Sequence, residues 1–288
     1  MSKQTEELVL PRYQEIISSK IQQHLPSFGG NSPLRNGCEY ALVNGGKRVR
    51  PAIVLMVAEA LGHKADVTYA ALAIEYFHTA SLVADDLPCM DDDDLRRSKP
   101  SVHKVFGEAA ALLVSYALIA EGYGCLEKGA RSLKSSSLPF ASKADLICSL
   151  ALENASFNTG PQGATGGQFI DLFPPNLELA TLREVIHKKT VSLFEVAFVF
   201  GWLYGGGDPS RLPQVKKMSS HFGMAFQIAD DLGDIEQDAK NGRLVNMAAV
   251  MGVKAAENLL QEEISQYQAA LEALHLRFMP LHHLVSEF

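Results

Sequence analysis

Residues 67–91 read VTYAALAIEYFHTASLVADDLPCMD, an apolar run that leads directly into a cluster of carboxylates. The apolar residues follow the 3.6-residue period of a helix, which is expected to span Val67–Ala84 and to precede Asp85, Asp86 and Asp91. Residues 226–234, FQIADDLGD, repeat this arrangement after a second apolar run. Both stretches indicate a helical fold whose long apolar helices carry clustered carboxylates.

The rest of the chain shows the same helical period, and no segment alternates polar and apolar residues convincingly as a half-exposed strand does. Clusters of Gly, Pro and Ser separate the periodic segments. No repeat and no change of composition marks a boundary, so residues 1–288 are expected to form one all-α domain, a single bundle of antiparallel helices. Helices are predicted over Glu6–Leu25, Pro51–Leu61, Val67–Ala84, Glu108–Gly129, Lys143–Phe157, Leu179–Tyr204, Gln214–Gln237 and Lys254–Phe278.

Composition excludes several classes of protein. Apolar residues make up 47% and charged residues 20%, which is typical of a globular protein with a substantial core. The net charge of −7 gives no general attraction to nucleic acid or to anionic lipid. The 4 cysteines lie far apart without a CxxC pair, so neither a zinc site nor a disulfide framework is indicated.

The same composition favours a cytoplasmic location. The first ten residues lack the basic start and apolar run of a signal peptide, so no cleaved leader is expected. The longest apolar stretch, Val191–Tyr204, is shorter than the roughly 20 residues of a membrane-spanning helix. A protein without a membrane span is therefore predicted.

The second acidic cluster shows why a cation is needed. Asp230 and Asp234 stand four residues apart and project from one helix face, with Asp231 about 100° away. Carboxylates brought together in this way repel one another unless a cation binds them. Oxygen ligands without neighbouring His or Cys select hard cations, and Mg²⁺ commonly shares its coordination between carboxylates and phosphate oxygens. A magnesium diphosphate site is the interpretation that this pattern favours.

Basic residues that could hold the diphosphates occur near the clusters. Residues 45–51, GGKRVRP, place Lys47 and Arg50 at the start of a predicted helix, where backbone N–H groups also favour anions. The adjacent guanidiniums of Arg96 and Arg97 follow the first cluster and can bind phosphate oxygens bidentately. Lys189 and Thr190 could address another diphosphate, and His78 lies two helical turns before Asp85 on a similar face.

Taken together, these motifs resemble the trans-isoprenyl (polyprenyl) diphosphate synthase family, and they occur in the expected order along nearly the whole chain. The matching segments are GGKRVRP at 45–51, DDLPCMDDDDLRR at 85–97, GGQ at 166–168, KT at 189–190 and FQIADDLGD at 226–234. The four-residue spacer between Asp86 and Asp91 is similar to that of the bacterial and plant short-chain members. The family fold is a bundle of antiparallel helices around a deep central cavity, generally in a homodimer.

The resemblance implies a role for each motif. Isopentenyl diphosphate would be bound by Lys47, Arg50, His78 and Arg97, and the allylic diphosphate would be surrounded by Arg96, Lys189, Thr190 and Gln227. Three Mg²⁺ ions would be held by Asp85, Asp91 and Asp230, with Asp86, Asp231 and Asp234 completing the acidic motifs. The family usually has a longer loop with two lysines after the second motif, for which Lys240 is the candidate substitute.

The resemblance also bears on the length of the product. In relatives, an aromatic residue five positions before the first Asp tends to stop growth at fifteen carbons, whereas this chain has Ala80 there, beside Ser81. Phe77, one turn deeper, could provide a second floor. Geranylgeranyl diphosphate is therefore the expected product and farnesyl diphosphate the second choice.

Two other functions remain open at this stage. A terpene cyclase would share the helical fold and the aspartate clusters, but it binds one diphosphate and does not need GGKRVRP. A non-catalytic partner subunit of another synthase is suggested by Ala84, where close relatives commonly carry His, and by Ser115-Tyr116 in place of a frequent Gly-Asp. Both acidic motifs are complete, which favours an active enzyme.

Overall fold

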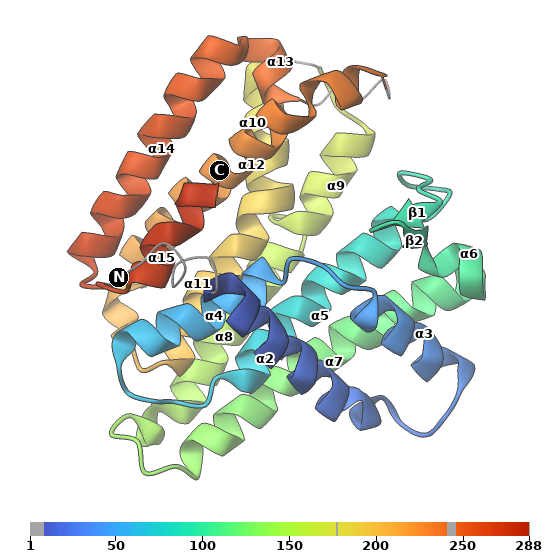
Figure 1. Ribbon diagram of the computed structural model, residues 1–288. Helices are drawn as coiled ribbons and strands as arrows, with labels where there is room; N and C mark the ends of the chain where they lie inside the picture. The colour runs from blue at the N-terminus through green and yellow to red at the C-terminus, as the bar shows by residue number, and fades with distance from the viewer. Residues whose placement is uncertain (1–8, 177, 241–245, 288) are drawn as a thin grey trace.

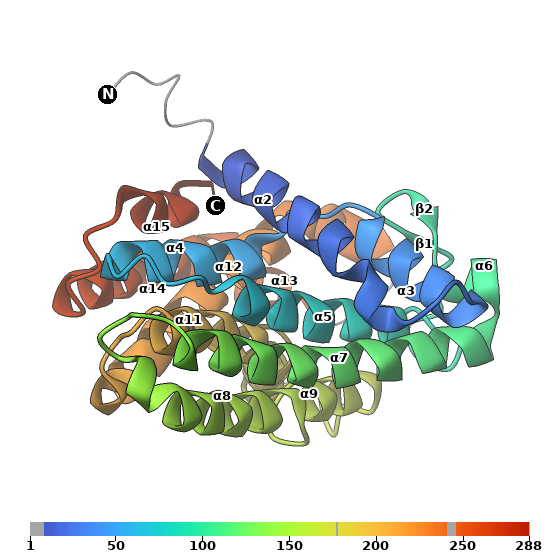
Figure 2. The same cartoon turned by 90° about the horizontal axis from the view of Figure 1, so that it is seen from below.

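The computed structural model describes residues 9–176, 178–240 and 246–287. For residues 9, 236–240 and 287 it describes the backbone alone. Within that part of the chain the fold is an assembly of helices with a single two-stranded hairpin, which confirms the all-α prediction. Figure 1 shows the longer helices side by side, and Figure 2 shows them stacked, with α2 (Val9–His24) lying across α4 (Val49–Leu61) and α5 (Thr68–Asp85).

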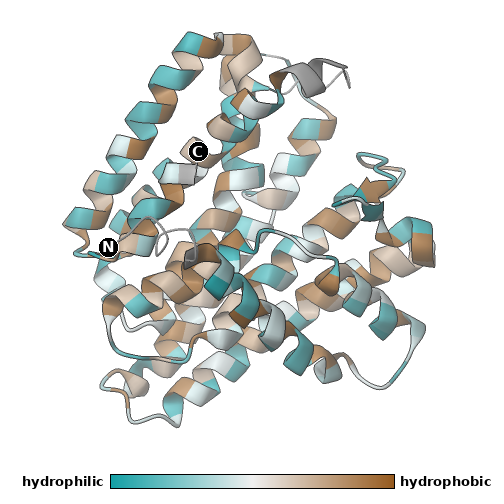
Figure 3. Cartoon of the chain, viewed as in Figure 1, coloured by the Kyte–Doolittle hydropathy of each residue, from teal (hydrophilic) through white to brown (hydrophobic). Residues whose placement is uncertain are grey.

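The core is organised around α11 (Ser192–Tyr204), in which every residue except Glu195 is buried. It packs against α4, α5, α8 (Ala144–Thr159) and α12 (Leu212–Lys240). Figure 3 shows mostly hydrophobic residues along α4 and α5, whereas α14 (Val253–Ala273) is hydrophilic over much of its surface. This amphipathic arrangement is the one that peripheral helices of a bundle require.

The packing of α5 against α7 (Glu108–Lys134) fixes the first acidic cluster. Small residues allow α7 to approach α5 closely: a Cβ on Gly122 would lie 2.6 Å from the Phe77 ring. The predicted helix over Val67–Ala84 is confirmed within one residue at each end, because α5 begins at Thr68 and ends at Asp85. The first aspartate is thus held at the end of a buried helix.

Several elements differ from the sequence-based expectation. Helices α3 (Pro33–Val43) and α9 (Ala164–Leu172) were not predicted, since each is short and rich in glycine or polar residues. The short strands β1 (Leu95–Arg96) and β2 (Lys99–Pro100) were also missed because two residues are too few to show alternation. The predicted helix Leu179–Tyr204 is instead α10 (Leu179–Ile186), a π-helical turn (His187–Val191) and α11.

The remaining elements complete the bundle. Helix α14 ends at Ala273 rather than at the predicted Phe278, because the chain turns at His275 through a left-handed φ of 59°. The start predicted at Glu6 lies outside the described residues, and α2 begins at Val9. The short helices are α6 (Val102–Phe106), α13 (Met247–Met251) and α15 (Met279–His283), with 3-10 turns at Leu25–Phe28, Ala141–Lys143, Pro209–Arg211 and Leu284–Glu287.

Helix α7 combines a buried face with an exposed apolar one. Among the described helices it alone is long and apolar enough to cross a membrane, a test that core helices of globular proteins also pass. Its buried face packs on α3, α5 and α8. Its other face exposes Leu112, Leu113, Tyr116 and Ile119.

Candidate active site

The first acidic cluster is compact. The loop after α5 turns back so that the amide of Asp91 donates to the backbone oxygen of Asp85, at 2.9 Å. Burial is the main reason that the pKa of Asp85 is raised to about 7; neighbouring Asp91 acts in the same direction and Lys189 opposes it. Asp86 is buried and pairs with Arg96, whose Nε lies 2.9 Å from its Oδ1. The pairing with Arg96 thus engages Asp86, and it does not involve Asp85 or Asp91.

A π-helical turn connects the two acidic clusters. Lys189 in this turn lies 3.9 Å from Asp91 and 2.6 Å from Asp171 of α9, measured from Nζ to the nearer carboxylate oxygen. Its neighbour Thr190 donates from Oγ1 to Gln227 of α12, at 2.8 Å. The wide turn thus directs consecutive residues to opposite clusters, and π turns are frequent at functional sites for this reason.

The second cluster separates into one buried and two exposed acids. Asp231 is buried, and its carboxylate accepts from Gln227 Nε2 and from the backbone amide of Met247, both at 2.8 Å. It therefore fixes the junction of α12 with α13. Asp230 and Asp234 lie one turn apart and are exposed, on the face expected from the sequence. Lys240 ends α12, and its side chain lies outside the described residues.

The hairpin after the first cluster separates the two guanidiniums. Arg97 and Ser98 form its two-residue turn with φ of 55° and 62°, the left-handed conformations of a type I′ turn. Arg96 turns to Asp86, whereas Arg97 donates to the backbone oxygen of Gly45 and lies against Gly46, where any side chain would collide with it. A tight turn thus holds the two arginines on different partners.

Arg97, Arg50 and His78 form a basic group beside the 45–51 segment. Nη1 of Arg50 lies 3.4 Å from Nε2 of His78, and its guanidinium stacks over Phe194 at 4.2 Å from the ring centroid. Burial lowers the pKa of Arg50 to about 10 and the pKa of His78 well below its ordinary value. Lys47 is exposed at the edge of this group.

Buried polar atoms without partners point to a ligand at this site. Nε of Arg50, Nδ1 of His78 and Oε1 of Gln168 are buried and have no hydrogen-bond partner among the described residues. Buried donors left unsatisfied are costly, typically by about 1–3 kcal/mol each. An anion placed beside Arg50 and His78 would satisfy both donors, with His78 in the appropriate tautomer.

The residues expected to limit chain length lie on the face of α5 that meets α7. Phe77 and Ala80 are buried, and the Phe77 ring contacts Tyr123 at a centroid distance of 5.0 Å. Ser115 of α7 donates to the backbone oxygen of Ala80 at 2.9 Å. Ser81 is partly buried, and its hydroxyl donates to the backbone oxygen of His78.

Four residues of the site were given no role of their own from the sequence. Gln168 donates to Asp91 at 3.1 Å, and Asp171, three residues later on the same helix, holds Lys189. Gln168 and Asp171 stand three residues apart on one helix face directly after Gly166 and Gly167, and this spacing could have indicated them from the sequence. Gly167 allows the close approach of α9, since a Cβ there would lie 2.5 Å from the amide nitrogen of Lys189. Arg48 belongs to the GGKRVRP motif at 45–51; it is buried and pairs with Glu75.

The donor set of the two clusters fits a hard divalent cation. Asp85, Asp91, Asp230 and Asp234 offer only carboxylate oxygens. The raised pKa of Asp85 shows that ionising this acid is unfavourable without additional positive charge. A divalent ion would supply that charge, and oxygen ligands are those that Mg²⁺ prefers.

Comparisons with known proteins agree with this site. The polyprenyl synthetase family model matches residues 31–248, more than half of the chain. A farnesyl diphosphate synthase of Geobacillus stearothermophilus is 34% identical over 239 residues, which cover 82% of this chain and 77% of the relative. The heterodimeric geranylgeranyl pyrophosphate synthase large subunit 1 of Arabidopsis thaliana is 31% identical over 87% of this chain, and the match spans 64% of that longer relative.

A solved structure extends the likeness to the whole fold. A geranyltransferase from Legionella pneumophila superposes with a TM-score of 0.83, over 99% of this chain and 96% of that chain, at 27% identity. The helices described above are thus arranged as in an isoprenoid synthase. The chain belongs to the polyprenyl synthetase family, and within it to the short-chain trans-prenyltransferases.

Proposed function

We propose that the protein condenses isopentenyl diphosphate with an allylic diphosphate and releases pyrophosphate, with geranylgeranyl diphosphate as the main product. The observation that carries this proposal is the pair of distinct cationic groups. Arg50, His78 and Arg97 surround one anion position, while Lys189 and Thr190 lie between the two acidic clusters. Two anion positions suit a reaction between two diphosphates, whereas a cyclase binds only one.

Each group has a defined part in this reaction. Asp85, Asp91 and Asp230 would hold Mg²⁺, proposed as three ions per site, and the ions would supply positive charge to the leaving diphosphate. Lys189 and Arg96 orient that diphosphate as its allylic C–O bond breaks and the oxygen keeps the electron pair. Arg50, Arg97, Lys47 and His78 hold isopentenyl diphosphate so that its double bond attacks the allylic carbon. Loss of a proton to the released pyrophosphate then restores a double bond.

Product length follows from the space beneath the allylic position. Ala80 leaves the first level open, and the Phe77 ring, fixed by Gly122 and Tyr123, closes the next level one turn deeper on α5. One turn of helix is about 5.4 Å along its axis, which is comparable with one isoprene unit. The pocket therefore suits a product one unit longer than an enzyme with an aromatic residue at position 80 would make.

We also propose that two copies associate through α7 and α8. These neighbouring helices expose large apolar residues, of which Tyr116 is 58% and Phe157 is 56% accessible; the others are Leu112, Leu113, Ile119, Leu146 and Leu152. Exposed apolar surface of this extent is typical of an interface. Tyr116→Glu is expected to shift the sedimentation coefficient from dimer to monomer, whereas Phe173→Glu, at the exposed residue that follows α9, is the control. A wild type that sediments as a monomer at micromolar concentration would contradict the interface.

The function is tested with purified protein, Mg²⁺, isopentenyl diphosphate and each allylic diphosphate, followed by chromatography of the products. Arg97→Ala is expected to raise KM mainly for isopentenyl diphosphate, and Arg96→Ala mainly for the allylic substrate. A charge-assisted hydrogen bond contributes about 1.5–3 kcal/mol, so the change should be roughly 10–100-fold. Equal changes for both substrates would refute the division, and pyrophosphate release without elongation would favour a cyclase.

A further inference from the structure

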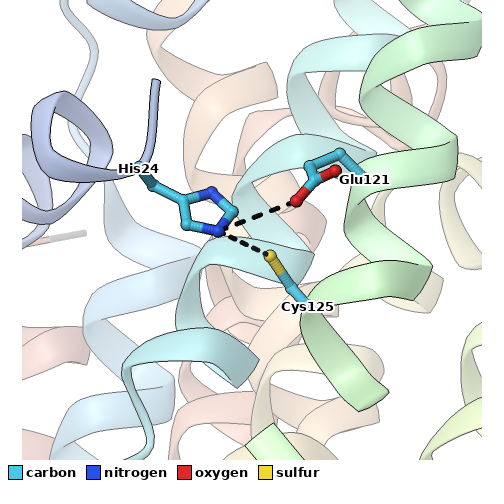
Figure 4. A group of neighbouring side chains, drawn as sticks. All are labelled: His24, Glu121 and Cys125. Atoms are coloured by element: carbon cyan, nitrogen blue, oxygen red, sulfur yellow. Dashed lines mark hydrogen bonds and ion pairs between the residues drawn. The ribbon is translucent and has the colours of Figure 1, made fainter. Parts of the chain in front are cut away.

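A second group of metal-ligating side chains lies away from the acidic clusters. His24 is the last residue of α2, and Glu121 and Cys125 stand one turn apart on the same face of α7 (Figure 4). Nε2 of His24 lies 3.7 Å from Oε1 of Glu121 and 3.9 Å from Sγ of Cys125. One ligand atom from each of the three lies within 4.8 Å of the others.

These separations are close to those of a tetrahedral metal centre. Zinc binds imidazole nitrogen and carboxylate oxygen at about 2.0–2.2 Å and thiolate sulfur at about 2.3 Å. In a tetrahedron, such bond lengths place nitrogen and oxygen roughly 3.3–3.5 Å apart and nitrogen and sulfur roughly 3.5–3.6 Å apart. Movements of a few tenths of an ångström would therefore bring all three atoms to one ion, with a fourth position left for water or another ligand.

The surroundings orient the histidine for this purpose. Nδ1 of His24 lies 2.8 Å from the hydroxyl of Tyr76, so a proton on Nδ1 would leave Nε2 free to bind a metal. The Tyr76 ring stacks beside the imidazole at a centroid distance of 5.8 Å. Burial lowers the pKa of His24, and the nearby Lys128 acts in the same direction. An oriented, neutral imidazole is the usual state of a metal-binding histidine.

One charge opposes a cation here. The ammonium of Lys128 pairs with Oε1 of Glu121, and its side chain is 37% exposed. Because Oε1 is also the carboxylate oxygen nearest Nε2 of His24, Lys128 would have to move to the other oxygen or turn to solvent when the ion binds. With Cys125 as thiolate and Glu121 ionised, a divalent ion is neutralised and Lys128 adds a single positive charge.

We propose that His24, Glu121 and Cys125 form a binding site for a zinc-class divalent ion, distinct from the magnesium site. The sulfur and nitrogen ligands select such a metal over Mg²⁺. Binding replaces the proton of the Cys125 thiol, which is released to solvent as the metal–sulfur bond forms. The ion would join the end of α2 to α7.

The location suggests what the ion does. Gly122, next to Glu121, faces the Phe77 ring, and Tyr76 precedes Phe77 on α5. The metal would therefore brace the helices directly behind the residue that we propose as the floor of the product pocket. Metal binding itself does not depend on that proposal and can be measured without substrates.

The experiment uses Co²⁺ as a spectroscopic substitute, added to metal-free, fully reduced protein in the presence of excess Mg²⁺ to occupy the carboxylate clusters. A thiolate-to-cobalt charge-transfer band is expected at one ion per chain, and Zn²⁺ should displace it. The band should disappear in Cys125→Ser and His24→Gln. In Glu121→Gln, the affinity for Co²⁺ should fall at least about tenfold, as it commonly does when a ligand or its support is lost. Circular dichroism verifies that each variant is folded.

Matched cysteine variants decide the outcome. Cys89→Ser and Cys148→Ser remove the exposed and partly buried thiols and should retain the band. No band in the wild type, a band that persists in folded Cys125→Ser or His24→Gln, or one that is lost in Cys89→Ser would overturn the assignment. The acidic group of Asp92, Asp94 and His103 contains no sulfur, so cobalt bound there gives no such band.

Discussion

Asp85→Asn is expected to lower kcat by at least about 10²–10³-fold, the loss typical of removing a preorganised electrostatic contributor. The amide keeps the shape of the side chain but lacks the charge that a cation needs. Product formation at saturating Mg²⁺ and substrates measures this loss. Wild-type turnover in the purified variant would contradict the assignment of Asp85 to the metal site.

The same substitution should stabilise the metal-free protein. The pKa of Asp85 is raised to about 7 in the fold, from an ordinary value of 3.8. Between about pH 4 and pH 7 the folded state therefore keeps a proton that the unfolded state loses, so this group makes the free energy of unfolding fall as pH rises. Asn does not ionise, so the Asp85→Asn variant lacks this pH-dependent loss. Its free energy of unfolding at pH 8 should exceed that of the wild type by about 1–3 kcal/mol.

Unfolding with a chelator at pH 4 and pH 8 tests this sign. The advantage of the variant should be large at pH 8 and small at pH 4, and added Mg²⁺ with pyrophosphate should stabilise the wild type more than the variant. Asp94→Asn is the control because Asp94 is exposed and its partner Lys104 is also exposed. If the Asp85→Asn variant is less stable than the wild type at pH 8, burial does not disfavour the ionised carboxylate of Asp85.

Substitutions at the pocket floor are expected to change the product in opposite directions. Phe77→Ala removes the ring held between Gly122 and Tyr123 and should shift the main product to one or more additional isoprene units. Ala80→Tyr places an aromatic group one turn closer to Asp85 and should shorten the product to fifteen carbons. Chromatography of the products from each allylic substrate gives the result.

Stability must be followed in the same variants. Loss of a buried phenylalanine typically costs about 3–5 kcal/mol, so Phe77→Leu provides a smaller cavity if Phe77→Ala does not fold. Tyr116→Ala tests the competing idea that this α7 residue, which is exposed in a single chain, sets the limit. Unchanged products in active Phe77 and Ala80 variants, together with a change in Tyr116→Ala, would move the floor to the α7 face.

The sequence was most informative where chemistry and periodicity coincide. An apolar helix that runs into Asp85 could be predicted because both its period and its end are local properties. The pairing of Arg96 with Asp86, in contrast, depends on a hairpin too short to leave a pattern. The engagement of Asp231 by Met247 joins residues on different helices, so spacing alone gave all three aspartates of that cluster a similar role.

The group of His24, Glu121 and Cys125 could not be predicted from the sequence either. Cys125 has only Glu121 and Glu127 as neighbouring carboxylates in sequence, and His24 lies 101 residues away from it. Ligand patterns built from close spacing cannot detect such a group. Its members meet only because α2 crosses over α5 and reaches α7.

The wide turn at His187–Val191 restricts how this chain can vary among its descendants. Deleting one residue there would restore an ordinary helix and rotate α10 by about 100° relative to α11. The buried helix could keep its place, but Lys189 and Thr190 could no longer meet Asp91 and Gln227 together. Selection should therefore act on the number of residues in this segment as strictly as on the identity of Lys189 and Thr190, so that insertions and deletions should not be retained here.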